Sequence, residues 1–262
     1  MSIIYINPFQ FAAAAAYDTD AQAYITAVEA ADGQALEAGV KDAINDFVVG
    51  CKTDGIFSAI KASCILAGAR TLSGALVPLV GTAPTNYNFV AGDYDRETGL
   101  KGDGSTKYLD SNRNNNADPQ NSLHQAIYIS SAPSVGAARV YMGAGVTDSG
   151  TTHIVRNTPG SFGSRNRNGT DFSPVSAVVT GFGGHSRSTS SGYTIRANNT
   201  DYATTRTSEV PYSGNTFIFS ANPASFYSDC RLSFYSIGES LDLALLDARV
   251  SQLMSDIGAA IP

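Results

Sequence analysis

The spacing of apolar residues in the first quarter of the chain predicts helices, because these residues recur every three or four positions. Thr19 followed by Gln22 resembles a capping box, which marks a helix start. The first predicted helix carries on one face Ala21, Tyr24, Ile25 and Val28, and it stops near Gly33. The second carries on one face Leu36, Val40, Ile44, Phe47 and Val48, and it ends near Gly50. A third is predicted after Thr53-Asp54-Gly55, with Ile56, Ile60 and Cys64 on one face and an end near Gly68.

From about residue 87 to 237 the helical period gives way to short apolar runs between turn residues, which predicts strands. These runs are Ala126–Ile129, Arg139–Met142, His153–Val155, Ala177–Val179, Tyr193–Ile195, Thr216–Phe219 and Leu232–Tyr235. Asn168-Gly169 is the pair preferred in tight hairpins, and Asn198-Asn199 is a weaker version. A final helix is predicted from Glu239 to Met254, with Leu241, Leu245, Ala248 and Leu253 close to one stripe.

The run from Leu76 to Pro84 is broken by two prolines and a glycine, and it separates the two patterns. We therefore expect a helical attachment or oligomerisation segment at residues 1–70. Residues 71–262 are expected to form a β-sandwich closed by the C-terminal helix. The fold class is mainly β, because many short strands separated by turns are typical of a sandwich or a barrel.

Composition narrows the function classes. The 262 residues carry a net charge of −6, so a nucleic-acid partner, which would need a basic face, is not expected. Cys51, Cys64 and Cys230 lack metal-ligand spacing and are expected to be buried free thiols.

The N-terminus begins with an apolar run that lacks the preceding positive charges of a signal peptide. Asn7-Pro8 interrupts the run, which is too short for a membrane span, so membrane insertion is not expected. These apolar side chains need burial, either on their own domain or on another subunit. The candidate anchor consists of Ile3, Ile4, Tyr5, Ile6, Phe9 and Phe11.

Two segments resemble concanavalin A-like (laminin-G-like) jelly-roll domains. Thr98–Leu109 (TGLKGDGSTKYL) is similar to an early strand–turn–strand unit, and Arg231–Gly238 (RLSFYSIG) is similar to the closing strand. A longer stretch, residues 17–257, resembles phage and prophage virion proteins with a helical leader and such a sandwich. The segments that carry this resemblance are residues 17–24, 45–56 and 104–120.

That resemblance implies a virion component, assembled in the host cytoplasm and belonging to a tail fibre, baseplate or head surface. Its lectin-like domain would serve host attachment, and its partners would be other virion proteins, contacted through the N-terminal segment. A homo-oligomer is expected, with a trimer favoured because phage fibres commonly are trimers. A purely architectural decoration or baseplate protein is the alternative, and a glycan-degrading enzyme is the third reading.

Candidate chemistry is sparse, so no enzyme activity, cofactor or bound metal is expected. The three histidines are not accompanied by a Gly-x-Ser-x-Gly nucleophile motif, and Glu97 and Glu209 are the only glutamates between residues 81 and 238. His153 lies in a strand pattern and is expected to be a hydrogen-bonded structural residue. Residues 92–97 and Asp103-Gly104 are interpreted as turns and caps rather than calcium ligands.

Polar residues that suit contact with a host-surface glycan or a neighbouring subunit fall in two sets. Arg113, Asn115, Asp118 and Gln120 belong to the Asn-rich segment 110–121, which is otherwise interpreted as a solvated loop. The second set is Arg156, Arg165 and Arg167, with Arg187 and Arg196 as further members. Three interpretations of the arginines remain: a solvated sheet face, contact with acidic helices of another subunit, or an acidic polysaccharide site.

Overall fold

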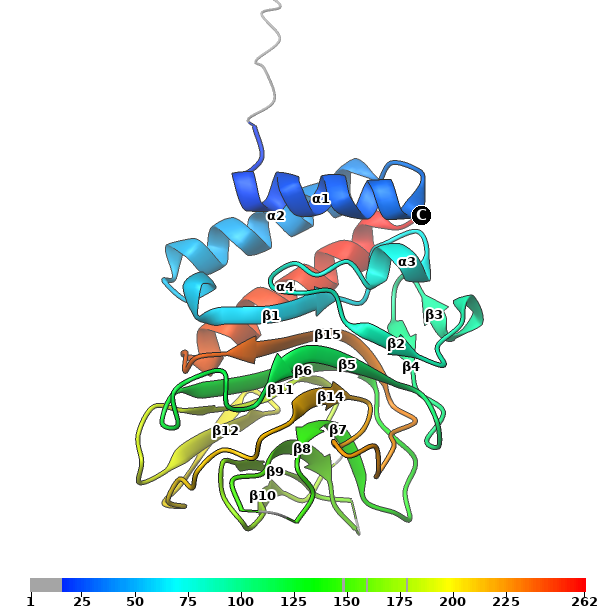
Figure 1. Cartoon of the computed structure of the whole chain (residues 1–262). Helices are drawn as coiled ribbons and strands as arrows, with labels where there is room; N and C mark the ends of the chain where they lie inside the picture. Colours follow the sequence, from blue (N-terminus) through cyan, green and yellow to red (C-terminus); the bar gives the residue numbers. More distant parts are fainter. Residues whose placement is uncertain (1–15, 148, 159, 178) are drawn as a thin grey trace, which may run out of the picture.

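The structure is a computed structural model that describes residues 16–147, 149–158, 160–177 and 179–262. It has three layers: helices on top, one antiparallel sheet beneath them, and a second sheet below (Figure 1). The predicted mainly β sandwich with helices at both ends is confirmed. The predicted anchor residues Ile3 to Phe11 lie outside the described residues.

Sheet A, the sheet under the helices, has eight strands. Their order is β13 (Thr200–Thr204), β12 (Tyr193–Ala197), β11 (Gly181–Arg187), β6 (Leu123–Ser131), β15 (Arg231–Gly238), β4 (Gly99–Lys101) and β3 (Tyr94–Asp95). The eighth, β1 (Ile60–Ile65), shares one edge of β15 with β4, because it pairs with Phe234–Gly238 while β4 pairs with Arg231 and Leu232. The predicted closing strand is thus the strand that joins most neighbours.

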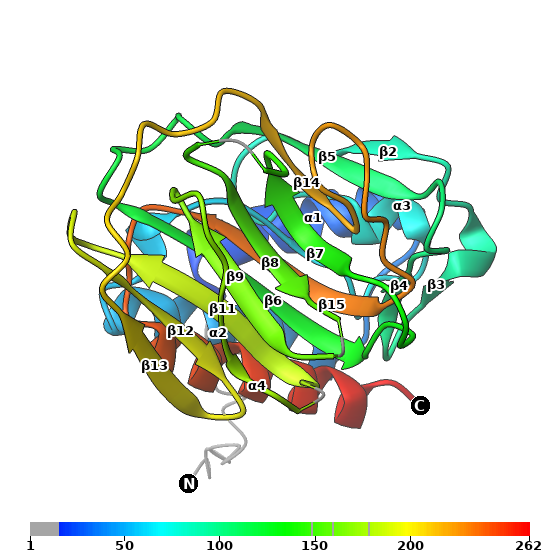
Figure 2. The same ribbon diagram turned by 90° about the horizontal axis from the view of Figure 1, so that it is seen from below.

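Sheet B has seven strands and lies on the side away from the helices (Figure 2). Their order is β10 (Phe172–Val175), β9 (Phe162–Asn166), β8 (Thr152–Arg156), β7 (Arg139–Ala144), β14 (Asn215–Ile218), β5 (Tyr108–Asn114) and β2 (Thr85–Tyr87). Alternate residues of both sheets, such as Ile127, Ile195, Leu109 and Ile154, fill the space between them. Burying these alternating side chains provides the main stabilisation of the sandwich.

The helices α1 (Thr19–Asp32), α2 (Ala38–Thr53) and α4 (Leu243–Ala260) form the top layer, and the short α3 (Leu72–Ala75) lies beside α1. The predicted apolar faces of the first two helices are confirmed as buried, and Gly33 ends α1 in the left-handed conformation. Phe47 of α2 packs edge-to-face on Phe234 of β15, with ring centroids 5.8 Å apart. Each helix therefore gains from sheet A the burial that it lacks alone.

The predicted third helix is wrong. Only Phe57–Ala59 is helical, as the 3-10 turn η1, and β1 follows it directly. Strand β1 is buried on both faces, between the helices and sheet B, and only Lys61 among its residues is partly exposed. Ile56, Ile60 and Cys64 are spaced four residues apart, and this spacing matches one face of a helix although the segment is extended. The division at residue 70 stays a prediction, although β1 lies before it and pairs with β15.

Of the two predicted hairpin turns, one is confirmed and the other is wrong. Asn198 and Asn199 form a two-residue turn between β12 and β13, with φ of 50° and 59°. Asn168-Gly169 is wrong as a two-residue turn, because β9 ends at Asn166 and β10 begins at Phe172. Ala177 and Val179 lie outside any strand. The C-terminal helix begins at an Asp242 cap and buries Leu246, Val250, Leu253 and Ile257, so the predicted stripe was out of phase at the half-exposed Leu245.

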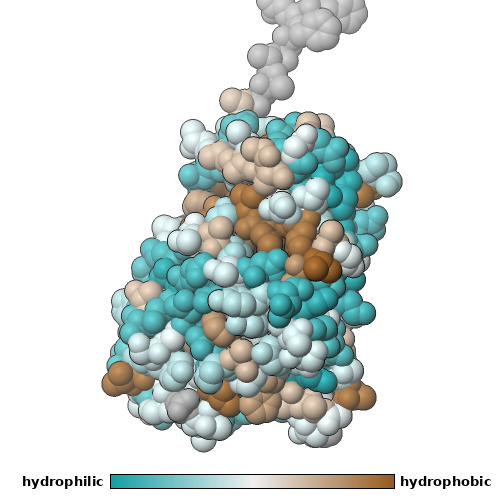
Figure 3. All heavy atoms as spheres, turned by 45° about the vertical axis from the view of Figure 1, so that its right-hand side comes forward, coloured by the Kyte–Doolittle hydropathy of each residue, from teal (hydrophilic) through white to brown (hydrophobic). Residues whose placement is uncertain are grey.

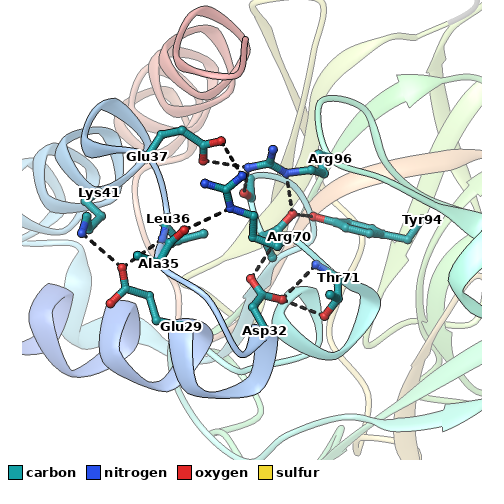
Figure 4. Close-up of polar contacts among 12 residues, drawn as sticks. Glu29, Asp32, Ala35, Leu36, Glu37, Lys41, Arg70, Thr71, Tyr94 and Arg96 are labelled. Atoms are coloured by element: carbon teal, nitrogen blue, oxygen red, sulfur yellow. Dashed lines mark hydrogen bonds and ion pairs between the residues drawn. The ribbon is translucent and has the colours of Figure 1, made fainter.

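Two carboxylates tie the α1–α2 hairpin to the sandwich (Figure 4). Asp32 accepts hydrogen bonds from the backbone N–H groups of Arg70 and Thr71, at 2.7 and 2.9 Å. Glu37 forms ion pairs with Arg70, at 3.0 Å, and with Arg96, at 2.8 Å. Apolar residues gather at this junction as well (Figure 3), where the half-buried Val77, Leu79 and Val80 pack on the helical core. The helical layer and sheet A are therefore joined by polar and apolar contacts together.

In the described part of the chain, no helix combines the length and apolar character needed to cross a bilayer.

Candidate binding site

The predicted loop residues come together at one end of the sandwich, where they hold the loop in place. Arg113 pairs with the buried Asp118 at 2.5 Å. Asn115 is buried and donates to the backbone oxygens of Gly150 and Tyr212, at 3.3 and 3.2 Å. Gln120 donates to Ser208 at 3.2 Å. These contacts join the loop to the two neighbouring loops that contain Gly150 and Tyr212.

Arg167 lies inside the molecule, so the expected solvated sheet face is wrong at this residue. It follows β9 with a φ of 54°, and its side chain is fully buried. The guanidinium donates to the backbone oxygen of Asn115 at 2.6 Å and to that of Pro119. A left-handed residue at the end of the strand turns the side chain away from the expected alternation. Arg167 thus holds the loop of residues 110–121 in place from inside the molecule.

The other arginines also bind within their own chain. Arg187 is fully buried and donates to five backbone oxygens, those of Asn166, Thr189, Ser190, Gly192 and Arg206. Arg196 pairs with Asp247 of α4 at 2.7 Å and with Asp201 at 2.9 Å. Arg156 is buried and donates to the backbone oxygen of Pro133. Contact of Arg113, Asn115, Asp118, Gln120, Arg156, Arg165 and Arg167 with a ligand or a second subunit stays a prediction.

Arg165 belongs to a row of cross-strand neighbours on the outer face of sheet B. Arg165 lies opposite His153 of β8, which lies opposite Gly143 of β7, and Gly143 lies opposite Phe217 of β14. Gly143 has no side chain to fill its place: a Cβ there would stand 2.6 Å from that of His153. The His153 side chain therefore occupies the space over the backbone of Gly143.

His153 and Arg165 line a pocket of about 120 Å³, which we call the outer-face pocket. Val140, Val155 and Ala221 are buried and pack together as a small apolar cluster with Val146. Phe226 lines the pocket and is 47% exposed. The other lining residues are Ala138, Val146, Thr147, His153, Asn157, Arg165 and Asp171. The pocket thus combines aliphatic and aromatic surface with a few polar groups, as small-molecule sites do.

Asp171 is the polar centre of the pocket. Its Oδ1 accepts hydrogen bonds from His153 Nε2, at 2.8 Å, and from Arg165 Nε, at 2.9 Å. Burial opposes ionisation of this carboxyl, but the contacts with His153 and Arg165 prevail and lower the pKa of Asp171 to about 2. Burial lowers the pKa of His153 as well, although Asp171 acts against this shift. At neutral pH the group therefore holds an ionised Asp171 and an uncharged His153.

The proton positions follow from these charges. An ionised carboxylate only accepts hydrogen bonds, so His153 carries its proton on Nε2. Both of these hydrogen bonds end on Oδ1, and no described residue donates to Oδ2 of Asp171, whose side chain is 31% exposed. Oδ2 is thus a fixed hydrogen-bond acceptor at the pocket. The prediction that His153 is a hydrogen-bonded structural residue is confirmed.

Sequence reasoning missed Asp171 and Phe226. Asp171 lies in the connection between β9 and β10, 18 residues after His153, and only the pairing of β8 with β9 brings the two together. Phe226 lies in the loop between β14 and β15, where no periodicity marks it. The Asn168-Gly169 turn signal was the one pattern that pointed to this connection.

A larger hollow, of about 530 Å³, lies between α2 and α4. Two of its polar side chains already have partners, since Arg249 binds Asp54 at 2.7 Å and Gln252 binds Asp256 at 2.7 Å. A cluster of three or more His, Cys, Asp or Glu side chains able to bind a metal does not occur among the described residues. The three cysteines are free and buried, as predicted. The outer-face pocket therefore remains the best candidate.

No protein-family model matches this chain, and no curated protein matches its sequence. Solved structures match it by fold. The binding domain of botulinum neurotoxin serotype D aligns with a TM-score of 0.50 and 10% identity, over 72% of this chain and 51% of that one. Trypanosoma rangeli sialidase aligns at 0.49 and 9%, over 83% and 39%. Domain 4 of an extracellular arabinanase from Geobacillus stearothermophilus, solved with arabinotriose, aligns at 0.44 and 11%, over 65% and 82%.

This chain spans 23% to 39% of the length of the sialidase-type chains that it matches. At these identities the likeness shows a two-sheet antiparallel β-sandwich fold and nothing more specific.

Proposed function

We propose that this protein is a non-enzymatic component of a bacteriophage virion, in a tail fibre or baseplate, whose β-sandwich binds a host-surface glycan in the outer-face pocket. The observation that carries the glycan proposal is the fixed acceptor Oδ2 of Asp171 beside Val140, Val155 and the half-exposed Phe226. A sugar presents hydroxyl donors on its rim and C–H groups on its faces, and this pocket offers a partner for each. The binding domain of botulinum neurotoxin serotype D shares the fold, which favours a binding role here.

The virion assignment is supported by the sequence resemblance over residues 17–257 and by the separation of the layers. The helices lie on sheet A, and sheet B lies on the side away from them (Figures 1 and 2). The pocket is on the outer face of sheet B. One side can therefore attach to the particle while the other meets the host. Partners would be other virion proteins and further copies of this chain, with a trimer favoured. An architectural protein without a ligand is the second candidate, since most polar contacts described above hold loops in place.

Replacing Asp171 by Asn should weaken glycan binding about 10- to 100-fold, because a hydrogen bond to a charged acceptor contributes roughly 1.5–3 kcal/mol. The change keeps the size of the side chain and removes the charge that His153 and Arg165 hold. Binding would be measured on a glycan array and then by calorimetry with the best ligand. Asp201→Asn is the control, because Asp201 also pairs with an arginine but lies on β13 of sheet A.

Asp201→Asn should leave the affinity unchanged. Equal affinity of D171N and the unchanged protein would remove the outer-face pocket as the site. A protein that binds no glycan on host cells or on the array would favour the architectural role.

Deleting residues 1–16 should leave a folded protein that no longer incorporates into particles. The described residues just after this segment make their contacts with the helical layer. Tyr17 donates a hydrogen bond to Asp42 at 2.8 Å, and Asp18 accepts one from Lys52 at 2.6 Å. Circular dichroism would check the fold, and particle composition would be measured by immunoblotting. Normal incorporation of the shortened protein would contradict an N-terminal anchor.

A further inference from the structure

We infer that the outer-face pocket selects a neutral, N-acetylated sugar, and that the acetamido group is the part that enters it. This inference rests on the proposed glycan binding and specifies its ligand. Three properties of the pocket carry it: its charge, its size, and the pairing of one acceptor with an aliphatic wall.

The charge of the pocket favours an uncharged ligand. Arg165 and Asp171 neutralise each other at 2.9 Å, and His153 is uncharged. The other lining residues carry no charge. A uronic or sialic acid would bring its carboxylate towards the exposed oxygen of Asp171, and the one cation nearby is already paired. An acidic polysaccharide, one of the three early interpretations of the arginines, is therefore disfavoured at this pocket.

The size of the pocket admits one substituent rather than a whole sugar ring. Pockets that enclose an entire drug-sized ligand measure roughly 300–1,000 Å³. The outer-face pocket measures about 120 Å³. The pyranose ring would therefore stay at the rim, within reach of Phe226, which is 47% exposed.

The pairing of groups in the pocket matches an acetamido substituent. Val140 and Val155 offer an aliphatic surface to a methyl group, and Asp171 Oδ2 accepts one N–H. Arg165 uses Nε and Nη1 in the bonds to Asp171 and to the backbone oxygen of Val146. Its guanidinium has five N–H donors, so a donor remains for the acetamido carbonyl. The other common sugar substituents match less well. A hydroxyl group has no methyl group for the valines, and the methyl group of a 6-deoxy sugar has no N–H for Asp171.

The test compares matched sugars on the unchanged protein by calorimetry or saturation-transfer NMR. N-acetylglucosamine and N-acetylgalactosamine should each bind at least 10-fold more tightly than glucose and galactose, presented as the methyl glycosides. Glucosamine and glucuronic acid should bind no better than glucose. Glycan binding that depends on Asp171 but shows no preference for the acetamido sugars would overturn this inference and leave the proposed function standing.

A variant pair tests the aliphatic wall. Val155→Thr keeps the side-chain shape and replaces one methyl group by a hydroxyl, so it should reduce the acetamido preference at least 3-fold. Val210→Thr is the matched control, because Val210 is 76% exposed and does not line the pocket. An unchanged preference in folded V155T would overturn the inference. If V155T does not fold, the sugar series on the unchanged protein decides, and absence of binding to every glycan would overturn the proposed function itself.

Discussion

Lowering the pH from 7 to 4 should remove more than about 3 kcal/mol from the free energy of unfolding, because three buried histidines must stay uncharged in the folded protein. Burial lowers the pKa of His124 from 6.5 to about 4. One pKa unit corresponds to about 1.4 kcal/mol, so His124 alone accounts for about 3 kcal/mol. Burial lowers the pKa of His185 well below its usual value, and that of His153 as well.

The direction follows from which state binds the proton. An unfolded histidine takes up its proton as the pH falls through about 6.5, whereas His124 in the folded protein resists until about 4. The histidine contribution is therefore complete above pH 6.5 and is lost between pH 6.5 and 4. The low pKa of Asp171, about 2, belongs to a separate loss that begins below pH 4, where unfolded carboxylates take up protons.

The surroundings of His185 explain why it should resist protonation most. It lies between the sheets, fully buried, and neither ring nitrogen has a hydrogen-bond partner among the described residues. The charged groups that act on it are Arg187 and Arg167, and both oppose a further positive charge, as His124 and His153 do once they are protonated. Burying a polar group without a partner is itself costly.

Urea unfolding at pH 7, 5.5 and 4.5 would measure the effect. His185→Met should leave stability at pH 7 equal or higher and should flatten the pH dependence, because it removes one titrating group and its unpaired nitrogens. A free energy of unfolding that stays constant between pH 7 and 4.5 would contradict the assignment of uncharged buried histidines.

Replacing Arg187 by Ala should destabilise the protein by roughly 3–5 kcal/mol, the scale for truncating a large buried side chain. The guanidinium donates six hydrogen bonds, at 2.7 to 3.4 Å, and two of them reach the backbone oxygen of Asn166. The variant would leave these acceptors unpaired and open a cavity. Arg187→Lys should restore only part of the loss, because an ammonium has three donors where guanidinium has five.

Thermal and urea unfolding at pH 7 would measure this change, with Lys101→Ala as the control at an exposed residue of β4. Folded R187A with unchanged stability would show that the network contributes nothing net.

The sequence predicted most elements whose two sides differ in polarity. Strand β12 and helix α2 each have one buried face, and both were located correctly. Strand β1 was assigned to a helix because Ile56, Ile60 and Cys64 are spaced four residues apart, which imitates the helical period. Closing strand β15 was predicted twice, from the short apolar run Leu232–Tyr235 and from its resemblance to the closing strand of jelly-roll domains, and nearly all of its residues are buried.

The candidate site was less predictable for a different reason. Arg165 was noted as a strand residue, but the value of its position comes from Asp171 and His153, which only sheet pairing brings near. Arg167 was assigned to the surface because the sequence gives no sign of its left-handed φ of 54°. An arginine next to a predicted strand is expected to continue the alternation of that strand. Long polar side chains that bind backbone oxygens, such as Arg187, have no local signal at all.

The stacking of helices, sheet A and sheet B has a mechanical consequence. A pull on a ligand held at the outer face of sheet B, with the particle holding the helical side, would load the three layers in series. The contacts of Asp32 and Glu37 with Arg70, Thr71 and Arg96 would then be stretched together with the apolar helix–sheet contacts. Hydrogen bonds and ion pairs depend on direction and distance, so they resist a sliding movement of the helices along the sheet. Apolar contacts are not directional, so they allow such a movement more easily. The strength of attachment would thus be set at the junction between helices and sheet as much as at the sugar.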